Sequence, residues 1–176
     1  RELMHENLRG KQNCTCTVSA QRIPSHLLLC NGHQRYAQDV HILVGTDAQW
    51  VLDEVLAALS SPENSFTVCS NGRDVPEAIN TRTPDVAILD LQFGTMGGMA
   101  VTMNLRLDHS DHRIPHIPVL MLLDRDADVH LAKRSGADGW LVKPLDALRI
   151  QRAIRALVAG DSWHEGTTAG AASSSR

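Results

Sequence analysis

The sequence lacks any apolar stretch long enough to cross a membrane. A membrane-spanning helix needs about 20 consecutive apolar residues, whereas arginine, aspartate or histidine interrupts every candidate run here. The longest nearly apolar stretch, residues 117–123, has the length of a buried β-strand. We therefore predict no contact with a membrane.

A surplus of basic residues is also absent. The chain carries 17 Lys and Arg against 20 Asp and Glu, a formal net charge of -3. Proteins that bind nucleic-acid phosphates normally present a basic surface. The charge balance therefore argues against direct DNA binding.

Cysteine is scarce, with four residues in the chain, and the sequence shows no secretory signal segment. We therefore expect a protein with reduced thiols in the cytoplasm. Cys14 and Cys16 are separated by one residue, whereas structural zinc sites usually separate paired cysteines by two or more. Unpaired thiols are the simpler interpretation.

The residues that are present are those of an ordinary globular domain, 43% hydrophobic and 21% charged. Residues 40–159 alternate short apolar runs with amphipathic stretches, and we predict that they form one domain. Residues 1–39 are polar and without a sustained period, which predicts a mostly disordered arm. Residues 160–176 end in a low-complexity segment, for which we predict a flexible tail.

Five apolar runs alternate with five helical patterns inside that domain. We predict strands at 40–45, 65–70, 85–90, 117–123 and 140–143. We predict helices at 51–59, 74–81, 98–107, 126–135 and 146–158. Strict alternation of this kind is typical of an α/β, doubly wound parallel sheet with right-handed crossovers and helices on both faces.

Charged residues stand at the carboxyl ends of three predicted strands: Asp47, Asp90 and Lys143. In a parallel sheet these ends share one edge, where ligands bind. Two carboxylates about 4 Å apart repel by roughly 4 kcal/mol at an effective dielectric near 20, so both stay charged at neutral pH only beside a cation. The pattern indicates a hard divalent metal beside an aspartate that could accept a phosphoryl group.

Simpler roles for these three residues stay open. Asp90 could cap the glycine-rich loop after its strand, and Asp47 could cap the following helix. Lys143 could be a solvated surface lysine. The active-pocket interpretation is favoured because all three residues fall at the same edge.

Residues 40–159 resemble the receiver domain of two-component response regulators. The resemblance rests on residues 84–90 (PDVAILD), with Met96 and Gly98 at the family's offsets, and on residues 136–144 (GADGWLVKP). It implies the chemotaxis-type, flavodoxin-like fold with five strands in the order 2-1-3-4-5. It also implies that Asp90 is the phosphoacceptor, that Lys143 pairs with the phosphoryl oxygens, and that the peptide bond before Pro144 is cis.

The metal-binding part of the family pattern is incomplete. The family's acidic pair after the first strand falls on Thr46 and Asp47, so one carboxylate is missing. The resemblance implies that Asp47, Asp90 and the backbone carbonyl of Gln92 bind Mg²⁺ weakly, with several waters retained and the Thr46 hydroxyl able to hold one of them.

The switching part of the pattern also departs from the family. The Thr or Ser that usually ends the fourth strand is Leu123, and the small residue that follows is Asp124. Leu123 has no hydroxyl for a phosphoryl oxygen, so we expect Trp140, at the family's switch position, to stay in place. Gly94 stands where the family usually has proline, which loosens that loop.

These observations predict a stand-alone, atypical receiver domain of a bacterial cytoplasm, a signalling module rather than an enzyme. A histidine kinase or phosphotransfer protein would phosphorylate Asp90, and output would pass through an unknown protein partner. The alternative is a pseudo-receiver that binds proteins and is never phosphorylated. The sequence leaves open whether the chain forms a homodimer.

Overall fold

The computed structural model describes residues 39–164. The predicted disordered arm lies outside these residues except for Asp39, as do Cys14, Cys16 and residues 165–176. Among the described residues, no helix is both long enough and apolar enough to span a membrane.

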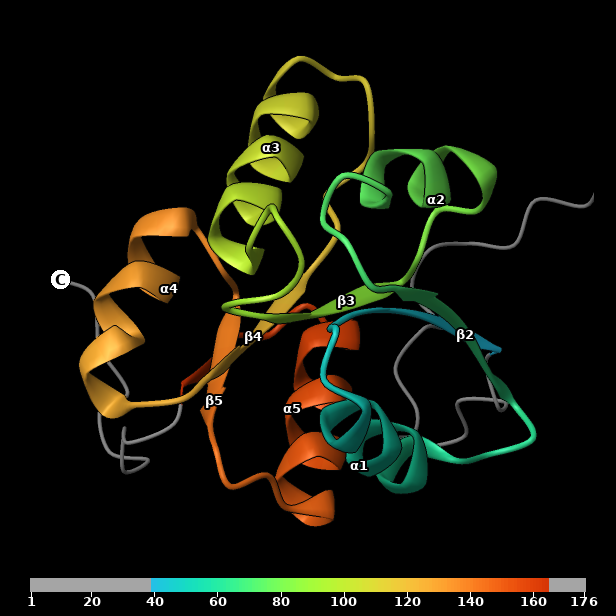
Figure 1. Cartoon of the computed structure of the whole chain (residues 1–176). Helices are drawn as coiled ribbons and strands as arrows, with labels where there is room; N and C mark the ends of the chain where they lie inside the picture. Colours follow the sequence, from blue (N-terminus) through green and yellow to red (C-terminus); the bar gives the residue numbers. More distant parts are fainter. Residues whose placement is uncertain (1–38, 165–176) are drawn as a thin grey trace, which may run out of the picture. The chain divides into compact units, whose positions relative to one another are not determined.

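Strands and helices alternate along the described chain (Figure 1). The strands are β1 (Val40–Gly45), β2 (Asn64–Cys69), β3 (Val86–Asp90), β4 (Val119–Leu123), β5 (Gly139–Val142) and β6 (Trp163–His164). The helices are α1 (Gln49–Leu59), α2 (Val75–Thr81), α3 (Gly98–Ser110), α4 (Val129–Ser135) and α5 (Ala147–Val158), with a 3₁₀ turn at Asp126–Asp128.

All strand pairs are parallel, and the sheet order is β2-β1-β3-β4-β5-β6. The predicted doubly wound α/β fold and the order 2-1-3-4-5 are confirmed. The fourth strand begins at Val119 rather than at residue 117. Pro118 has no N–H to donate to a neighbouring strand, and its carbonyl oxygen accepts from the Ala87 N–H at 2.9 Å.

The sixth strand corrects the sequence prediction, which assigned residues 163 and 164 to a flexible tail. Trp163 pairs with Gly139, and His164 pairs with Trp140. The absence of a side chain at Gly139 permits this approach, since a Cβ there would lie only 2.7 Å from the Trp163 carbonyl oxygen. A two-residue strand is too short to show a period in sequence.

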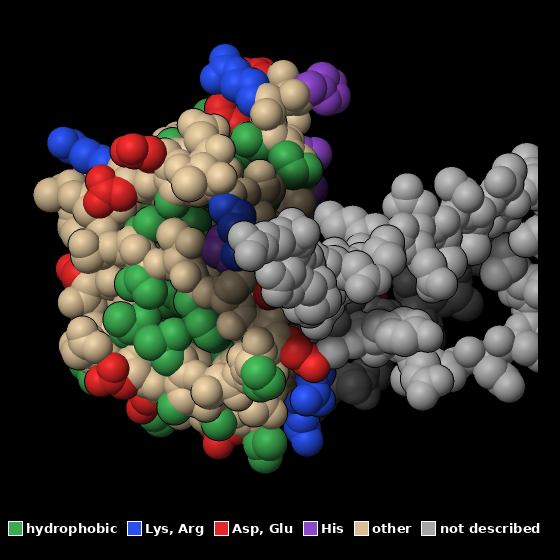
Figure 2. Space-filling model, turned by 90° about the vertical axis from the view of Figure 1, so that its right-hand side faces the viewer, with side chains coloured by type: hydrophobic (Ala, Val, Ile, Leu, Met, Phe, Trp, Pro, Cys, Tyr) green, Lys and Arg blue, Asp and Glu red, His purple; other side chains and the backbone are tan. Residues whose placement is uncertain are grey.

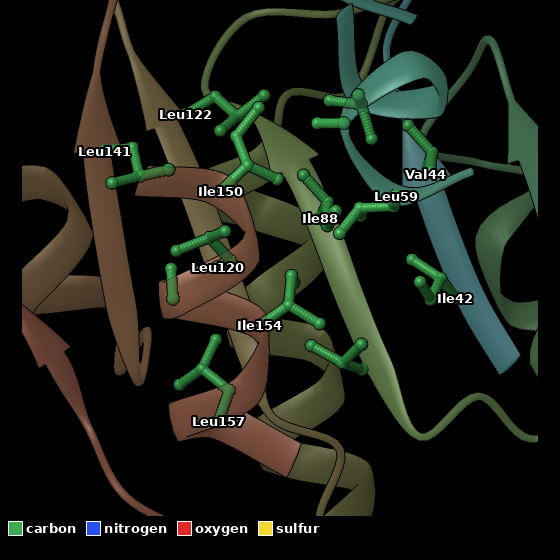
Figure 3. Close-up of a cluster of buried hydrophobic side chains, with 14 of the residues drawn as sticks. Ile42, Val44, Leu59, Ile88, Leu120, Leu122, Leu141, Ile150, Ile154 and Leu157 are labelled. Atoms are coloured by element: carbon green, nitrogen blue, oxygen red, sulfur yellow. The ribbon is translucent and has the colours of Figure 1, made fainter. Parts of the chain in front are cut away.

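Helices cover both faces of the sheet, with α1 and α5 on one face and α2, α3 and α4 on the other (Figure 1). The larger core cluster lies between the sheet and α1 and α5 (Figure 3). Successive strand residues point to opposite faces, so Ile42 and Val44 belong to this cluster while Leu43 belongs to the cluster beneath α2 and α3. The central strands are therefore buried on both faces, which explains their continuous apolar runs.

A third apolar cluster lies towards α4. Its buried members are Leu91, Met121, Leu123, Ala132 and Trp140. It joins the end of β4 to β5 and α4 through side chains that are almost completely buried.

Charged side chains are mixed on the side of the molecule near α2 and β2. Figure 2 shows Lys and Arg side chains interspersed with Asp and Glu on this face rather than gathered into one basic surface. The part of this face that the grey atoms leave visible shows no continuous positive surface of the kind typical of nucleic-acid-binding proteins.

Candidate functional site

Asp90 and Lys143 meet at the carboxyl edge of the sheet, as the strand pattern predicts. Asp90 is the last residue of β3 and is only 2% exposed. The Nζ of Lys143, which directly follows β5, donates to Oδ2 of Asp90 at 2.8 Å. The Lys143–Pro144 peptide bond is cis, as the resemblance implied.

Lys143 binds a second carboxylate as well. Its Nζ donates to Oδ1 of Asp124, the residue after β4, at 2.9 Å. The Asp124 side chain is 48% exposed, whereas that of Asp90 is 3% exposed. The sequence pattern predicts a metal ion as the cation beside the carboxylates at this edge, whereas in the structure the ammonium of Lys143 binds two of them.

Opposing effects act on the ionisation of this pair. Burial raises the pKa of Asp90, Lys143 lowers it, Asp124 raises it again, and the net pKa lies above the ordinary range. Burial lowers the pKa of Lys143, but hydrogen bonds from its ammonium to the two carboxylates outweigh this effect and raise the net pKa. Lys143 is therefore fully charged at neutral pH.

Thr46 and Asp47 have different partners. The buried hydroxyl of Thr46 lies 3.5 Å from Oδ2 of Asp90, and its oxygen accepts from the Ala48 N–H at 3.2 Å. Oδ2 of Asp47 accepts from the Gly94 N–H at 2.9 Å. Asp47 therefore joins the loop after β1 to the loop after β3.

The possibility that Asp47 caps the following helix is wrong. The N-cap residue of α1 is Ala48, and no side chain caps this end. The bond to the Gly94 N–H depends on the conformation of Gly94, whose φ of 53° is one that L-residues rarely adopt.

Oxygen atoms at this edge offer a partial fit to a hard metal ion. Oδ1 of Asp90 is buried and has no hydrogen-bond partner, and hard cations such as Mg²⁺ prefer carboxylate and carbonyl oxygens. Gln92, whose carbonyl was a predicted ligand, lies exposed in the loop after β3. Within residues 39–164, however, no group of three or more His, Cys, Asp and Glu is arranged to hold a metal. An ion bound here would therefore take few ligands from these side chains and would need water for the rest.

Two of the three predicted switch positions, Leu123 and Trp140, belong to the apolar cluster towards α4, whereas the side chain of the third, Asp124, is 48% exposed and lies outside it. Leu123 is fully buried at the end of β4, and Trp140 is 4% exposed on β5. The Trp140 ring stacks on His164 of β6 at a centroid distance of 4.2 Å. The Nζ of Lys133 lies 5.4 Å from the centroid of the Trp140 ring.

Two residues of this region escaped the sequence analysis. Trp50, in the first turn of α1, is 51% exposed, and Nζ of Lys143 lies 5.2 Å from its ring centroid. The position of Trp50 shortly after the first strand could have indicated that it lies near the site, because the residues after parallel strands fall at the same edge of the sheet. No sequence signal indicated the stacking of His164 on Trp140.

Comparison with known proteins agrees with this geometry. Residues 42–155 match the family described as response regulator receiver domain. The chain belongs to this family.

Individual relatives cover the same region. The protein PilH of Pseudomonas aeruginosa is 28% identical over 119 residues, which are 68% of this chain and 98% of PilH. The transcriptional regulatory protein CseB of Streptomyces avermitilis is 29% identical over 124 residues, 69% of this chain and 50% of CseB. The match therefore spans half the length of CseB and nearly all of PilH.

A solved structure shows the same fold. The signal receiver domain of the response regulator NarL from Mycobacterium tuberculosis superposes with a TM-score of 0.59 at 29% identity. The superposition covers 70% of this chain and 98% of that domain.

Proposed function

We propose that this chain is an atypical single-domain response regulator that accepts a phosphoryl group on Asp90 from a histidine kinase or a phosphotransfer protein. The observation that supports this most strongly is the buried Asp90 carboxylate, with Oδ2 held by Lys143 at 2.8 Å and Oδ1 left without a partner. The match of residues 42–155 to the response regulator receiver domain family also supports the role of a phosphoacceptor.

In the proposed reaction an oxygen of Asp90 attacks phosphorus, and the bond from phosphorus to the donor breaks. The product is an acyl phosphate on Asp90, and the donor leaves with the bonding electrons. The reaction needs the ionised carboxylate, which Lys143 favours against the effect of burial. The Lys143 ammonium then donates to a phosphoryl oxygen, since charge-assisted bonds of this kind stabilise phosphate groups.

Receiver domains bind Mg²⁺, which would offset the negative charge of the incoming phosphoryl group. In this chain Asp47, Asp90 and the backbone carbonyl of Gln92 would hold the ion, with the Thr46 hydroxyl available to a bound water. Affinity is low because Thr46 supplies a hydroxyl where a second carboxylate would bind more strongly.

Signalling then proceeds through protein contacts, in the cytoplasm of a bacterium and without direct DNA binding. The proposed role is that of a signalling protein rather than an enzyme with a separate substrate.

Incubation with acetyl phosphate and MgCl₂, followed by intact mass measurement, tests the proposal. We expect the mass of one phosphoryl group to be added, and EDTA to prevent this addition. Asp90→Asn is the matched control, because it keeps the shape of the side chain and removes the nucleophile. Labelling that persists in Asp90→Asn would overturn the assignment.

The competing function is a pseudo-receiver, a protein interaction module that is never phosphorylated. Two observations favour it. Leu123 offers no hydroxyl at the end of β4, and the Lys143 ammonium already donates a hydrogen bond to Asp124. Failure of the natural chain to label with several small donors and kinases would favour this function.

A further inference from the structure

The ammonium group of Lys143 is shared between two carboxylates and an aromatic ring in the described structure. It has three N–H groups. It binds Asp90 at 2.8 Å and Asp124 at 2.9 Å, and it lies 5.2 Å from the Trp50 ring centroid, within the range of a cation–π contact. A phosphoryl oxygen on Asp90 therefore competes for Lys143 with carboxylates that the ammonium already binds.

Asp124 is the partner best able to leave. Its side chain is 48% exposed and follows the end of β4, whereas Asp90 is enclosed at the end of β3. An exposed carboxylate regains hydration when it turns outward, so its release costs less than that of a buried group. The resting contact between Asp124 and Lys143 is consequently reversible.

Charge makes this competition unfavourable for phosphorylation. Asp47, Asp90 and Asp124 bring three carboxylates to this edge, and Lys143 is the cation bonded to two of them. A phosphoryl group adds about −1.5 to −2 charge at pH 7. Asp124 both repels this charge and holds the ammonium that would neutralise it.

We infer that Asp124 is a positioning residue that restrains Lys143 and acts as an internal competitor of the phosphoryl group. This inference rests on the proposed function of Asp90. The restraint slows the phosphorylation of Asp90 by weak phosphodonors. A donor that contacts Lys143 or displaces Asp124 phosphorylates Asp90 faster.

The test compares labelling rates by acetyl phosphate, with MgCl₂, in four proteins: the natural chain, Asp124→Asn, Asp124→Glu and Asp126→Asn. Asp124→Asn should label faster by on the order of tenfold, the effect of removing a hydrogen bond between charged groups. Asp124→Glu keeps the carboxylate and should return the rate towards that of the natural chain. Asp126 is an exposed neighbour whose side chain has no partner among the described residues, so Asp126→Asn controls for loss of charge alone.

A second measurement avoids covalent chemistry. Beryllium fluoride with Mg²⁺ serves as a non-covalent probe for the phosphoryl group, and its apparent affinity should rise in Asp124→Asn and not in Asp126→Asn. A role in folding alone would shift the melting temperature of Asp124→Asn without this gain in affinity.

The outcomes separate the two proposals. Labelling of the natural chain with no gain in Asp124→Asn, or with an equal gain in Asp126→Asn, overturns the restraint and leaves the phosphoacceptor role intact. Labelling of Asp124→Asn alone supports both. Absence of labelling in every protein overturns the phosphoacceptor role, and the restraint with it.

Discussion

Different interactions hold the side chains in the interior of the sheet and those at its carboxyl edge. In the interior, side chains such as Ile88, Leu120 and Leu141 are buried among other apolar residues, and any of them is positioned by the packing of many neighbours (Figure 3). At the edge, Lys143 is positioned by a few polar contacts, chiefly to Asp90 and Asp124. The interior therefore tolerates similar apolar residues, whereas a single substitution at the edge changes the chemistry.

Truncation in the interior should have the largest effect on stability. Leu141→Ala removes a fully buried side chain and leaves a cavity, which costs about 2–5 kcal/mol of unfolding free energy. Leu148→Ala is the control, because Leu148 is 61% exposed and its truncation should change stability by less than about 0.5 kcal/mol. Urea denaturation measures both, and equal losses would contradict the assigned core.

Removal of Trp163 tests whether β6 belongs to the interior. Its side chain packs against the larger core cluster, so Trp163→Ala should cost about 1.5–3 kcal/mol. Trp50→Ala removes an equally large side chain that is 51% exposed and should cost less. If the two losses of unfolding free energy are the same, β6 is not docked on β5.

Substitution of Asp90 at the edge should raise the stability of the protein at neutral pH, whereas truncation in the interior lowers it. The folded-state pKa of Asp90 is raised above its ordinary value, so its contribution to stability is fully present below the unfolded pKa, near 3.9, and is lost as pH rises through the folded pKa. Asp90→Asn stays neutral at every pH. Its melting temperature at pH 7 should exceed that of the natural chain by a few degrees, and the difference should shrink towards pH 4. A lower melting temperature at pH 7 would contradict the pKa direction.

The strands of the interior could be predicted from the sequence because each of them consists of several apolar residues in succession. Successive buried residues of β1 and β3 define strands without knowledge of any single contact, and the rule for parallel sheets then brings Asp90 and Lys143 to one edge. The bond from the Gly94 N–H to Asp47 was not predictable, because it depends on the positive φ of Gly94. The pairing of Trp163 with Gly139 was not predictable either, since two residues carry no period.

The smallest effect concerns the boundary between interior and edge, where Leu123 packs in the same cluster as Trp140. An apolar side chain of this size gains roughly 1.5–3 kcal/mol from burial, which holds one packing arrangement against a modest bias. The double variant Leu123→Thr with Asp124→Ala should regain a response of Trp140 to phosphorylation, measured by fluorescence emission. If the fluorescence emission of Trp140 does not change when the double variant is phosphorylated, Leu123 is not the cause of the lost response.

We propose that this chain keeps the phosphoacceptor chemistry of its family and has lost the usual switching of Trp140. Nuclear magnetic resonance of the ¹⁵N-labelled natural chain, recorded with and without beryllium fluoride and Mg²⁺, tests both parts in one spectrum. We predict that the backbone amides of Asp90 and Lys143 shift while the indole N–H of Trp140 keeps its position. A clear shift of the Trp140 indole on addition of the probe would contradict the account.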